Sequence, residues 1–166
     1  MRIIIEGCDG TGKTTLANKL MQEYDLSYHH STSVTTNDFP YHFNWLMEEK
    51  MVFDRFHYGE VVYANVFNRR CKIDPIDFLN IEEECSNDNQ TFTFVLYSSD
   101  IDVLKERLDI RGNETEDVLE NLIAINDGFI RVLRQAEKIN KRVWGIDISK
   151  HLDTFYVANQ IILQNL

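Results

Sequence analysis

The chain has 166 residues, 43% of them hydrophobic, which is enough for one globular domain with a sizeable core. Its net charge is −10, and it contains no apolar run of membrane-spanning length and no start that resembles a signal peptide. Its three cysteines have neither disulfide nor metal-ligand spacing. We therefore expect a cytoplasmic protein that binds a small molecule and neither a membrane nor a long nucleic acid.

The first predicted element is a buried strand, because residues 2–6 form a β-branched run. The glycine-rich stretch Gly7-Cys8-Asp9-Gly10-Thr11-Gly12-Lys13-Thr14 follows, and a helix is expected from Thr14 to Tyr24. Strand, glycine-rich turn and helix together predict a phosphate-binding loop, whose backbone N–H groups and helix N-terminus attract phosphate. Lys13 would reach the β- and γ-phosphates of a nucleoside triphosphate, and the Thr14 hydroxyl would bind Mg²⁺.

Strands and helices alternate along the rest of the chain. In chain order we expect a strand at 26–30, a polar connector at 31–37, a helix from the cap Asp38 to 47, a strand at 51–53, a helix around 61–67, a helix from 74–75 to about 85, a strand at 91–97, a helix from the cap Asp100 to a break at 112–113, a long helix from about 116 to 140, a strand at 143–148 and a helix at 151–166. This order predicts one α/β domain over residues 1–166. Its expected fold is a P-loop NTPase three-layer αβα sandwich, with a five-stranded parallel sheet in the order 2-3-1-4-5 and helices on both faces.

Asp54-Arg55 stands at the end of the predicted third strand. In a parallel sheet this end lies beside the phosphate loop, where a carboxylate can orient Mg²⁺ or its water. The adjacent arginine can clamp a second phosphate with its planar fork. The pair therefore indicates a metal-binding residue, Asp54, and a substrate-binding and catalytic residue, Arg55.

Arg107 and Arg111 are four residues apart and share one face of the predicted helix. The break after them suggests a short lid at about 109–115 that closes over the site. Two positive charges on such a lid would neutralise charge on a transferring phosphoryl group. A solvated charged face is the alternative, because acidic residues surround them.

Asp9 is an unusual residue for a phosphate site, and its carboxylate must point toward a hydroxyl or water, or else cap the helix. Several aromatic residues can stack on a base, although each can equally pack in the core: Phe39, Phe43, Trp45, Tyr58 and Tyr63. The five histidines show no metal spacing.

Three stretches resemble thymidylate kinases: Ile5 to Thr15, which is similar to that family's N-terminal signature, the triplet Asp54-Arg55-Phe56, and Arg107-x-x-x-Arg111-Gly112. The resemblance implies an ATP- and Mg²⁺-dependent kinase of (deoxy)nucleoside monophosphates, a compact, phage-like member that forms a homodimer. It implies an ATP-binding loop from Gly7 to Thr15 and a contact of Asp9 with the 3′-hydroxyl of the acceptor.

By the same resemblance Lys13, Arg55 and a lid arginine stabilise the transferred group. Because Gly10 stands where other members carry arginine, the catalytic arginine would be Arg107 or Arg111. Phe56, Phe39 and Tyr63 complete the expected acceptor pocket. The chain departs from the family between Ser31 and Lys50, which is short and contains no arginine.

Two other functions remain open from the sequence. A deoxynucleoside kinase would use Glu60 or Asp54 as a base toward a 5′-hydroxyl, and Asp54 to Glu60 faintly resembles the motif of such enzymes. A GTP- or ATP-binding regulatory module is the third, although Asn140-Lys141-Arg142-Val143 departs from the guanine-reading Asn-Lys-x-Asp signature. The leading prediction is conversion of dTMP to dTDP.

Overall fold

The computed structural model describes residues 1–32, 37–112, 115–151 and 153–166. The elements in chain order are β1 (Arg2–Gly7), α1 (Lys13–Tyr24), β2 (Ser27–His30), α2 (Phe39–Leu46), β3 (Met51–Asp54), α3 (His57–Val66), α4 (Pro75–Asn87), β4 (Thr91–Tyr97), α5 (Ile101–Arg111), α6 (Glu116–Glu120), α7 (Leu122–Ala136), β5 (Val143–Asp147) and α8 (Thr154–Asn165). None of the helices in these ranges is long and apolar enough to cross a membrane.

The five strands form one sheet in the order β2-β3-β1-β4-β5, and every neighbouring pair is parallel. This confirms the predicted fold class and strand order. The central strand β1 pairs with β3 on one side and β4 on the other, and Ile3, Ile4 and Ile5 are fully buried. A strand covered on both faces reads as a continuous apolar run, which is why this segment lacks polar alternation.

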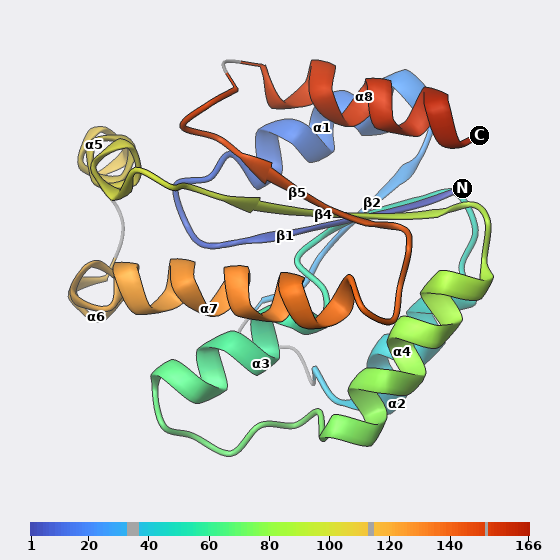
Figure 1. Cartoon of the computed structure of the whole chain (residues 1–166), viewed down its shortest axis with the longest axis horizontal. Coiled ribbons are helices and arrows are strands. Elements are labelled where there is room, and N and C mark those ends of the chain that lie inside the picture. Colours follow the sequence, from blue (N-terminus) through green and yellow to red (C-terminus); the bar gives the residue numbers. More distant parts are fainter. Residues whose placement is uncertain (33–36, 113–114, 152) are drawn as a thin grey trace.

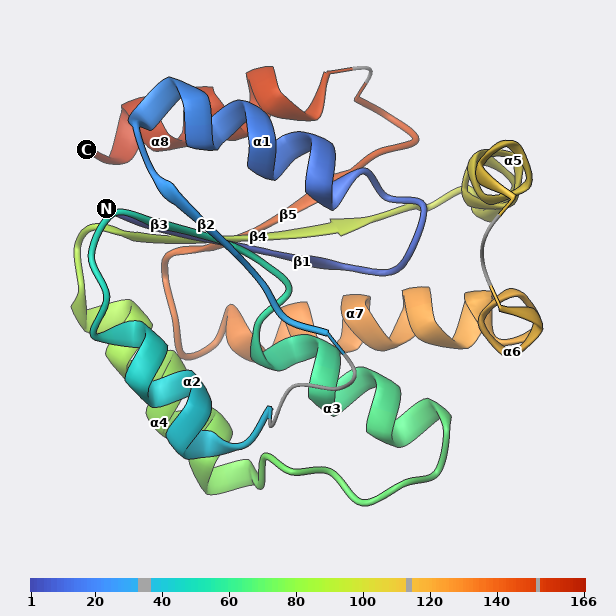
Figure 2. The ribbon, with the colours of Figure 1, turned by 180° about the vertical axis from the view of Figure 1, so that it is seen from behind.

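Helices cover both faces of the sheet, giving the expected three layers (Figure 1). Helices α1 and α8 lie on one face, and α2, α3, α4 and α7 lie on the other, as the view from behind also shows (Figure 2). Helices α5 and α6 stand beyond the carboxyl ends of β1 and β4, opposite the two chain termini. The phosphate loop, the end of β3 and α5 therefore meet at one end of the molecule, where an α/β sheet binds ligands.

Three predicted helix starts carry side-chain caps, two of them at the expected residues Asp38 and Asp100. The Asp38 carboxylate accepts a hydrogen bond from the N–H of Tyr41, and the Asp100 carboxylate accepts one from the N–H of Asp102. Asp74 accepts from Ile76 and Asp77 in a capping box with Pro75 in the first turn. Short polar side chains satisfy N–H groups that a helix start leaves without partners, so these caps were readable from the sequence.

The prediction of one long helix from 116 to 140 is wrong, because the segment forms two helices, α6 and α7. The backbone leaves helical geometry at Asn121, with φ −100° and ψ 9°, and α7 ends at Ala136. A one-residue break leaves the apolar periodicity almost unchanged, so the pattern could not reveal it. The last helix begins at Thr154 with Asp153 as its cap and not at His151, while residue 152 lies outside the described residues.

Two other predicted segments fall partly outside the described residues. These are the connector at 31–37, of which 33–36 are not described, and the lid at 109–115, of which 113 and 114 are not described. Within the lid, Arg111 is the last residue of α5, and Gly112 follows with a left-handed φ of 65°. This conformation favours glycine and ends the helix where the sequence predicted.

Candidate active site

The phosphate loop connects β1 to α1 and needs glycine at two positions. A Cβ on Gly7 would lie 2.2 Å from the carbonyl oxygen of Leu96 in the neighbouring strand. Gly12, with φ 88°, stands at the N-cap of α1, and no side chain caps that helix. Uncapped N–H groups at a helix start attract an anion. The loop therefore has the geometry of a phosphate site.

A cavity of about 430 Å³ opens over this loop. Its lining comprises Asp9, Gly10, Gly12, Lys13, Thr14, Thr15, His30, Asp54, Arg55, Arg107 and Arg111. We call it the donor cavity. Gly7, Cys8 and Thr11 shape the loop without lining the cavity, and the Thr11 hydroxyl donates to the Cys8 carbonyl at 2.8 Å.

The ammonium group of Lys13 is buried and donates a hydrogen bond to the Cys8 carbonyl oxygen at 2.7 Å. Burial and the nearby Arg55 guanidinium lower the pKa of Lys13 from its ordinary value. A phosphate in the donor cavity would offer this buried charge a negative partner. The loop thus holds the lysine at the wall of the donor cavity.

The metal-binding candidates Thr14 and Asp54 meet directly, since the Thr14 hydroxyl donates to Asp54 Oδ2 at 2.5 Å. The same oxygen accepts from the Tyr28 hydroxyl at 3.0 Å and lies 3.4 Å from His30 Nδ1. The other oxygen, Oδ1, is buried without a hydrogen-bond partner among the described residues. A hard cation such as Mg²⁺ fits this donor set.

The described residues contain no group of three or more His, Cys, Asp and Glu side chains that could hold a metal ion. Mg²⁺ in phosphate-loop sites needs no such group, because it keeps several waters and takes phosphate oxygens as ligands. Thr14 and Asp54 would therefore hold the ion only together with a bound triphosphate.

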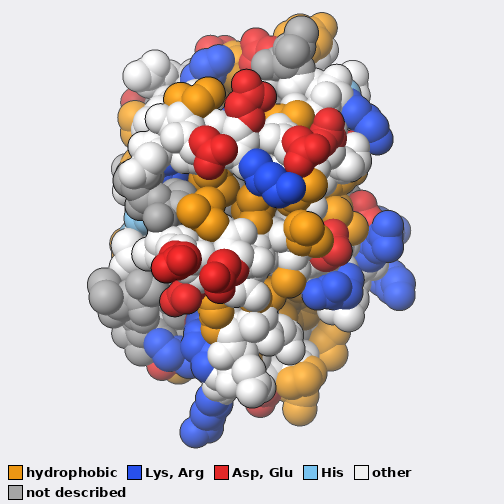
Figure 3. Space-filling model, turned by 90° about the vertical axis from the view of Figure 1, so that its left-hand side faces the viewer, with side chains coloured by type: hydrophobic (Ala, Val, Ile, Leu, Met, Phe, Trp, Pro, Cys, Tyr) orange, Lys and Arg blue, Asp and Glu red, His pale blue; other side chains and the backbone are white. Residues whose placement is uncertain are grey.

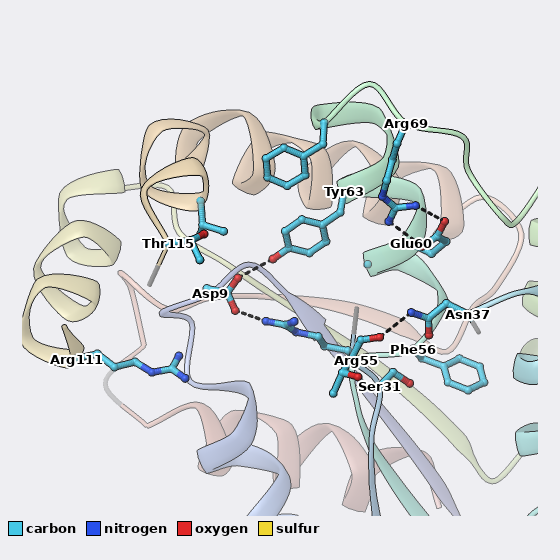
Figure 4. A pocket seen from close by; sticks show the side chains of 14 residues that line it. Asp9, Ser31, Asn37, Arg55, Phe56, Glu60, Tyr63, Arg69, Arg111 and Thr115 are labelled. Carbon is cyan, nitrogen blue, oxygen red and sulfur yellow. Dashed lines mark hydrogen bonds and ion pairs between the residues drawn. The ribbon is translucent and has the colours of Figure 1, made fainter. Parts of the chain in front are cut away.

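A second cavity, of about 490 Å³, adjoins the first. Its lining comprises Asp9, Ser31, Thr32, Asn37, Arg55, Phe56, Gly59, Glu60, Tyr63, Phe67, Arg69, Arg111, Thr115 and Val118. We call it the acceptor cavity (Figure 4). Asp9, Arg55 and Arg111 line both cavities, so these three side chains mark the junction between them.

The Asp9 carboxylate at the junction is held by two other elements. The Arg55 guanidinium donates to Asp9 Oδ1, and the Tyr63 hydroxyl donates to Asp9 Oδ2 at 2.8 Å (Figure 4). Burial opposes ionisation of Asp9, but Lys13, Arg55 and Tyr63 together hold its pKa below the usual range. Although burial also opposes the charge of Arg55, Asp9 above all raises the pKa of that guanidinium. Both groups are therefore charged.

At the far end of the acceptor cavity, Arg69 forms a bidentate pair with Glu60, with N–O distances of 2.7 and 2.8 Å. The backbone N–H of Lys72 donates to the same carboxylate at 2.9 Å. Burial favours the neutral acid, yet Arg69 and this N–H lower the pKa of Glu60. Tyr63 and Phe67 stack in parallel, 6.1 Å apart, and form an aromatic wall.

The two lid arginines project from α5. Arg107 Nη1 lies 3.5 Å from the Gly10 carbonyl oxygen and lines the donor cavity only. The Arg111 side chain extends from the end of α5 toward Asp9 and Arg55 (Figure 4). Arg111 is thus the lid residue at the junction, where a group passing between the cavities would be transferred.

Some sequence candidates lie elsewhere. Phe39 contacts Phe43 with tilted rings and packs against the core around Leu46, and neither cavity includes it in its lining. Phe56 lines the acceptor cavity but is only 2% exposed, so it supports the wall from below. Burial raises the pKa of Cys8 to about 12, which leaves its thiol unreactive.

The sequence reasoning missed two residues that bond to lining residues, Glu6 and Tyr28, and three that line the cavities, His30, Phe67 and Arg69. The last two follow α3 in a loop, where the sequence shows only a Phe-Asn-Arg-Arg run without a known motif. Tyr28 and His30 are two residues apart on the edge strand β2, and the register that sets His30 opposite Asp54 brings both side chains to the Asp54 carboxylate. That register depends on the pairing of distant segments, so the sequence alone does not reveal it.

No protein-family model matches the chain, and no curated protein sequence matches it either. Solved structures do match. The YorR protein from Bacillus subtilis, in complex with phosphorylated GDP, is 24% identical with a TM-score of 0.81, over 99% of this chain and 95% of that one. Deoxyadenosine kinase from M. mycoides with bound dCTP is 18% identical with a TM-score of 0.62, over 99% and 98%.

Thymidylate kinase from Candida albicans also matches, with 16% identity and a TM-score of 0.60, over 99% of this chain and 91% of that one. Identities this low establish the fold and not the reaction. The chain has the P-loop kinase fold, and its structural neighbours include nucleotide and nucleoside kinases.

Proposed function

We propose that the protein transfers the γ-phosphoryl group of ATP to a deoxynucleoside monophosphate, with dTMP as the preferred acceptor and dTDP as the product. The observation that carries this proposal is the junction of Asp9, Arg55 and Arg111 between two adjoining cavities. Two guanidinium groups lie where the phosphate of an acceptor would face the γ-phosphate of a donor. A monophosphate acceptor needs such positive charge at this point.

In the donor cavity, the loop N–H groups and Lys13 would bind the β- and γ-phosphates of ATP. Thr14 and Asp54 would hold Mg²⁺, which supplies further charge neutralisation when it is bound. No protein nucleophile is required, because a phosphate oxygen of the acceptor attacks the γ-phosphorus directly. The protein would position the two nucleotides and neutralise the charge of the transferred group.

In the acceptor cavity, the Arg55 fork would bind the acceptor phosphate, and Asp9 would accept a hydrogen bond from the sugar, as the family resemblance implies. At the far end, Glu60 engages two N–H groups of Arg69, so the remaining guanidinium donors are oriented by that pair. A cation offers only donors to a base edge. Such a donor favours thymine, which has the carbonyl oxygen O4, over cytosine, which carries an amino group at the same position.

The surface charge agrees with a small anionic substrate. The chain carries a net charge of −10. On the end of the molecule where α5 and α6 lie, the described side chains in view are mixed in type and form no continuous basic surface (Figure 3). Positive charge is instead concentrated inside the site, at Lys13, Arg55 and the lid arginines. Such a distribution favours a nucleotide over a polymer.

A deoxynucleoside kinase is the second candidate, favoured by the fold of the M. mycoides deoxyadenosine kinase. That reaction needs a carboxylate free to take a proton from a 5′-hydroxyl. Glu60 is engaged by Arg69 and by the Lys72 N–H, and its pKa is lowered, so it is a weak base. Asp54 lines only the donor cavity and bonds to Thr14. Neither carboxylate supports this candidate.

A regulatory nucleotide-binding module is the third candidate. Its guanine-reading asparagine would be Asn140, but this side chain is buried and donates to Glu82 Oε2 at 3.1 Å. Such a module would also have no use for arginines at the junction of two cavities. The kinase proposal therefore accounts for more of the site.

A coupled assay of ADP release, with ATP and Mg²⁺ against all nucleosides and their monophosphates, tests the proposal. We expect the highest kcat/KM with dTMP, and chromatography should identify the product as dTDP. Turnover of thymidine with dTMP inert would establish the second candidate, and no ADP release above background would reject the kinase proposal. Light scattering tests the homodimer that the family resemblance implies.

A further inference from the structure

The turn that carries Arg55 joins the end of β3 to the start of α3 and has an unusual backbone. Arg55 has a φ of +72°, in the left-handed region that non-glycine residues rarely adopt. Such a conformation is strained and persists only where the surroundings enforce it. The backbone N–H of Arg55 donates to the carbonyl oxygen of Ile5 in β1 at 2.9 Å. A central strand thus fixes the first residue of the turn.

Glu6, the next residue of β1, fixes the rest of the turn through its side chain. Its Oε1 atom accepts hydrogen bonds from the N–H groups of Phe56, at 3.0 Å, and Tyr58, at 2.8 Å. These groups belong to the N-terminus of α3, whose own N-cap residue, Phe56, provides no side-chain cap. Glu6 therefore caps α3 from a different strand, where the helix dipole favours a negative charge.

The position of Glu6 is energetically unfavourable for its carboxyl group. The residue is fully buried, and its Oε2 atom has no hydrogen-bond partner among the described residues. Burial raises the pKa of Glu6 despite the nearby His57 and the two N–H groups. Burying an oxygen atom without a hydrogen-bond partner lowers the stability of the fold, so stability alone does not explain this residue. Its position next to the turn suggests a different use.

We propose that Glu6 is a positioning residue for Arg55. The segment from Ile5 to Asp9 holds Arg55 at both ends: Ile5 and Glu6 hold its backbone turn, and Asp9 holds its guanidinium. The strand that leads into the phosphate loop thereby sets the distance between the donor phosphates and the acceptor clamp. The role in phosphoryl transfer depends on the proposed function, whereas the placement of Arg55 can be measured without a substrate.

The test uses Glu6→Ala, which removes both hydrogen bonds, and Glu6→Gln, which keeps an acceptor oxygen. Asp74→Ala is the matched control, because Asp74 also caps a helix by accepting from two N–H groups and lies outside both site cavities. The first readout is the Nε–H resonance of Arg55 in nitrogen-15 spectra of the substrate-free protein, assigned with Arg55→Lys. The second is the KM for dTMP beside the KM for ATP.

We expect Glu6→Ala to shift or broaden the Arg55 resonance and to raise the KM for dTMP about tenfold or more, since the two hydrogen bonds that hold the turn are lost. The KM for ATP should change less than about threefold, because neither Glu6 nor the two N–H groups that it holds belong to residues that line the donor cavity. Glu6→Gln should restore both readouts. Asp74→Ala should lower the melting temperature and leave both readouts unchanged.

An unchanged Arg55 resonance in Glu6→Ala, or an equal change in Asp74→Ala, would overturn the inference. If Glu6→Ala does not fold, Glu6→Asp replaces it, because it keeps the charge but is too short to hold both N–H groups. A shifted resonance in Glu6→Asp with a normal one in Glu6→Gln supports positioning, and the reverse refutes it. If no monophosphate reacts, the proposed function fails, while the resonance still decides the role of Glu6.

Discussion

The donor cavity takes six of its eleven lining residues from one continuous stretch of chain, Asp9 to Thr15. The acceptor cavity is instead assembled from residues after β2, the turn after β3, α3, the loop after α3, the lid and α6. The two cavities also differ in how their charges are held. In the acceptor cavity each main charge already has a partner, as in Asp9–Arg55 and Glu60–Arg69. In the donor cavity, buried Lys13 donates its hydrogen bond to a carbonyl oxygen, and Asp9, the carboxylate that most opposes the lowering of its pKa by burial, is already paired with Arg55.

This difference has consequences for substitutions. Removing the donor lysine takes away a contact that matters when phosphate is bound, and it leaves no buried charge without a partner. Removing one member of an acceptor pair leaves the other charge buried and unpaired, which costs stability as well as affinity. Donor substitutions should therefore change turnover alone, and acceptor substitutions should change both turnover and folding.

The largest effect is expected for Lys13→Met. Turnover should fall by about 10²–10³-fold or more, because a charge that stabilises the transferring group is lost. The melting temperature should stay the same or rise, since a buried ammonium is replaced by an apolar side chain of similar length. Steady-state kinetics and calorimetry measure both. Lys19→Met on the same helix, at a side chain 52% exposed, is the control and should change neither.

The second-largest effects are expected for the two junction arginines, Arg111 and Arg55, which should affect kcat and KM respectively. Arg111→Met should lower kcat by about 10²-fold with little change in KM, because its contact matters most in the transition state. Arg55→Met should mainly raise the KM for the acceptor, by about tenfold or more, because a phosphate clamp is lost. Lys105→Met, elsewhere on α5, is the control and should behave like the wild type. A KM effect at Arg111 with a kcat effect at Arg55 would contradict this division.

A smaller effect concerns the choice of base. Arg69→Met should reduce the preference for dTMP over dCMP by about tenfold, because a specific donor contact to a base is worth about 1–3 kcal/mol. The ratio of kcat/KM for the two acceptors measures it. Arg70→Met removes a neighbouring exposed arginine and should leave the ratio unchanged. If Arg69→Met and Arg70→Met lose the preference equally, Arg69 acts through its positive charge and not through a specific contact with the base.

The same contrast between the cavities explains what the sequence could predict. The phosphate loop, Lys13 and Thr14 belong to one local motif, whose geometry follows from glycine conformations and a helix start. The end of β3 was also predictable, because parallel strands bring their carboxyl ends to one edge. The five-strand order was expected from the loop and the alternation of elements, and the sheet confirms it.

The acceptor cavity could not be predicted in the same way. Glu60 and Arg69 are nine residues apart, and they meet only because the chain turns back after α3. Glu6 lies within a quoted motif, yet its role depends on N–H groups fifty residues away. Phe39, predicted at the substrate, lies in α2 beside Phe43 and lines neither cavity. Pairings between distant segments leave no periodic trace in one sequence.

The smallest effect is on the acid stability of the Asp9–Arg55 pair. A carboxyl whose pKa is lower in the folded than in the unfolded state stabilises the fold above the unfolded value, about 3.9, and this stabilisation is lost as the pH falls through the folded pKa. The pKa of Asp9 is lowered although burial opposes it, and Arg55 is one of the causes. Arg55→Met removes that cause, so the variant should melt about 2–5 °C below the wild type at neutral pH.

This difference in melting temperature should shrink as the pH falls below about 4, because protonation of Asp9 then removes the advantage from the wild type too. Calorimetric scans between neutral pH and about pH 3 would measure the difference at each step. Lys105→Met is again the matched control, since its partner Asp102 is an exposed carboxylate and such pairs add about 0–1 kcal/mol. That variant should show a small difference at every pH. A difference for Arg55→Met that stays constant, or grows in acid, would mean that Arg55 stabilises the fold through packing and not through the charge of Asp9.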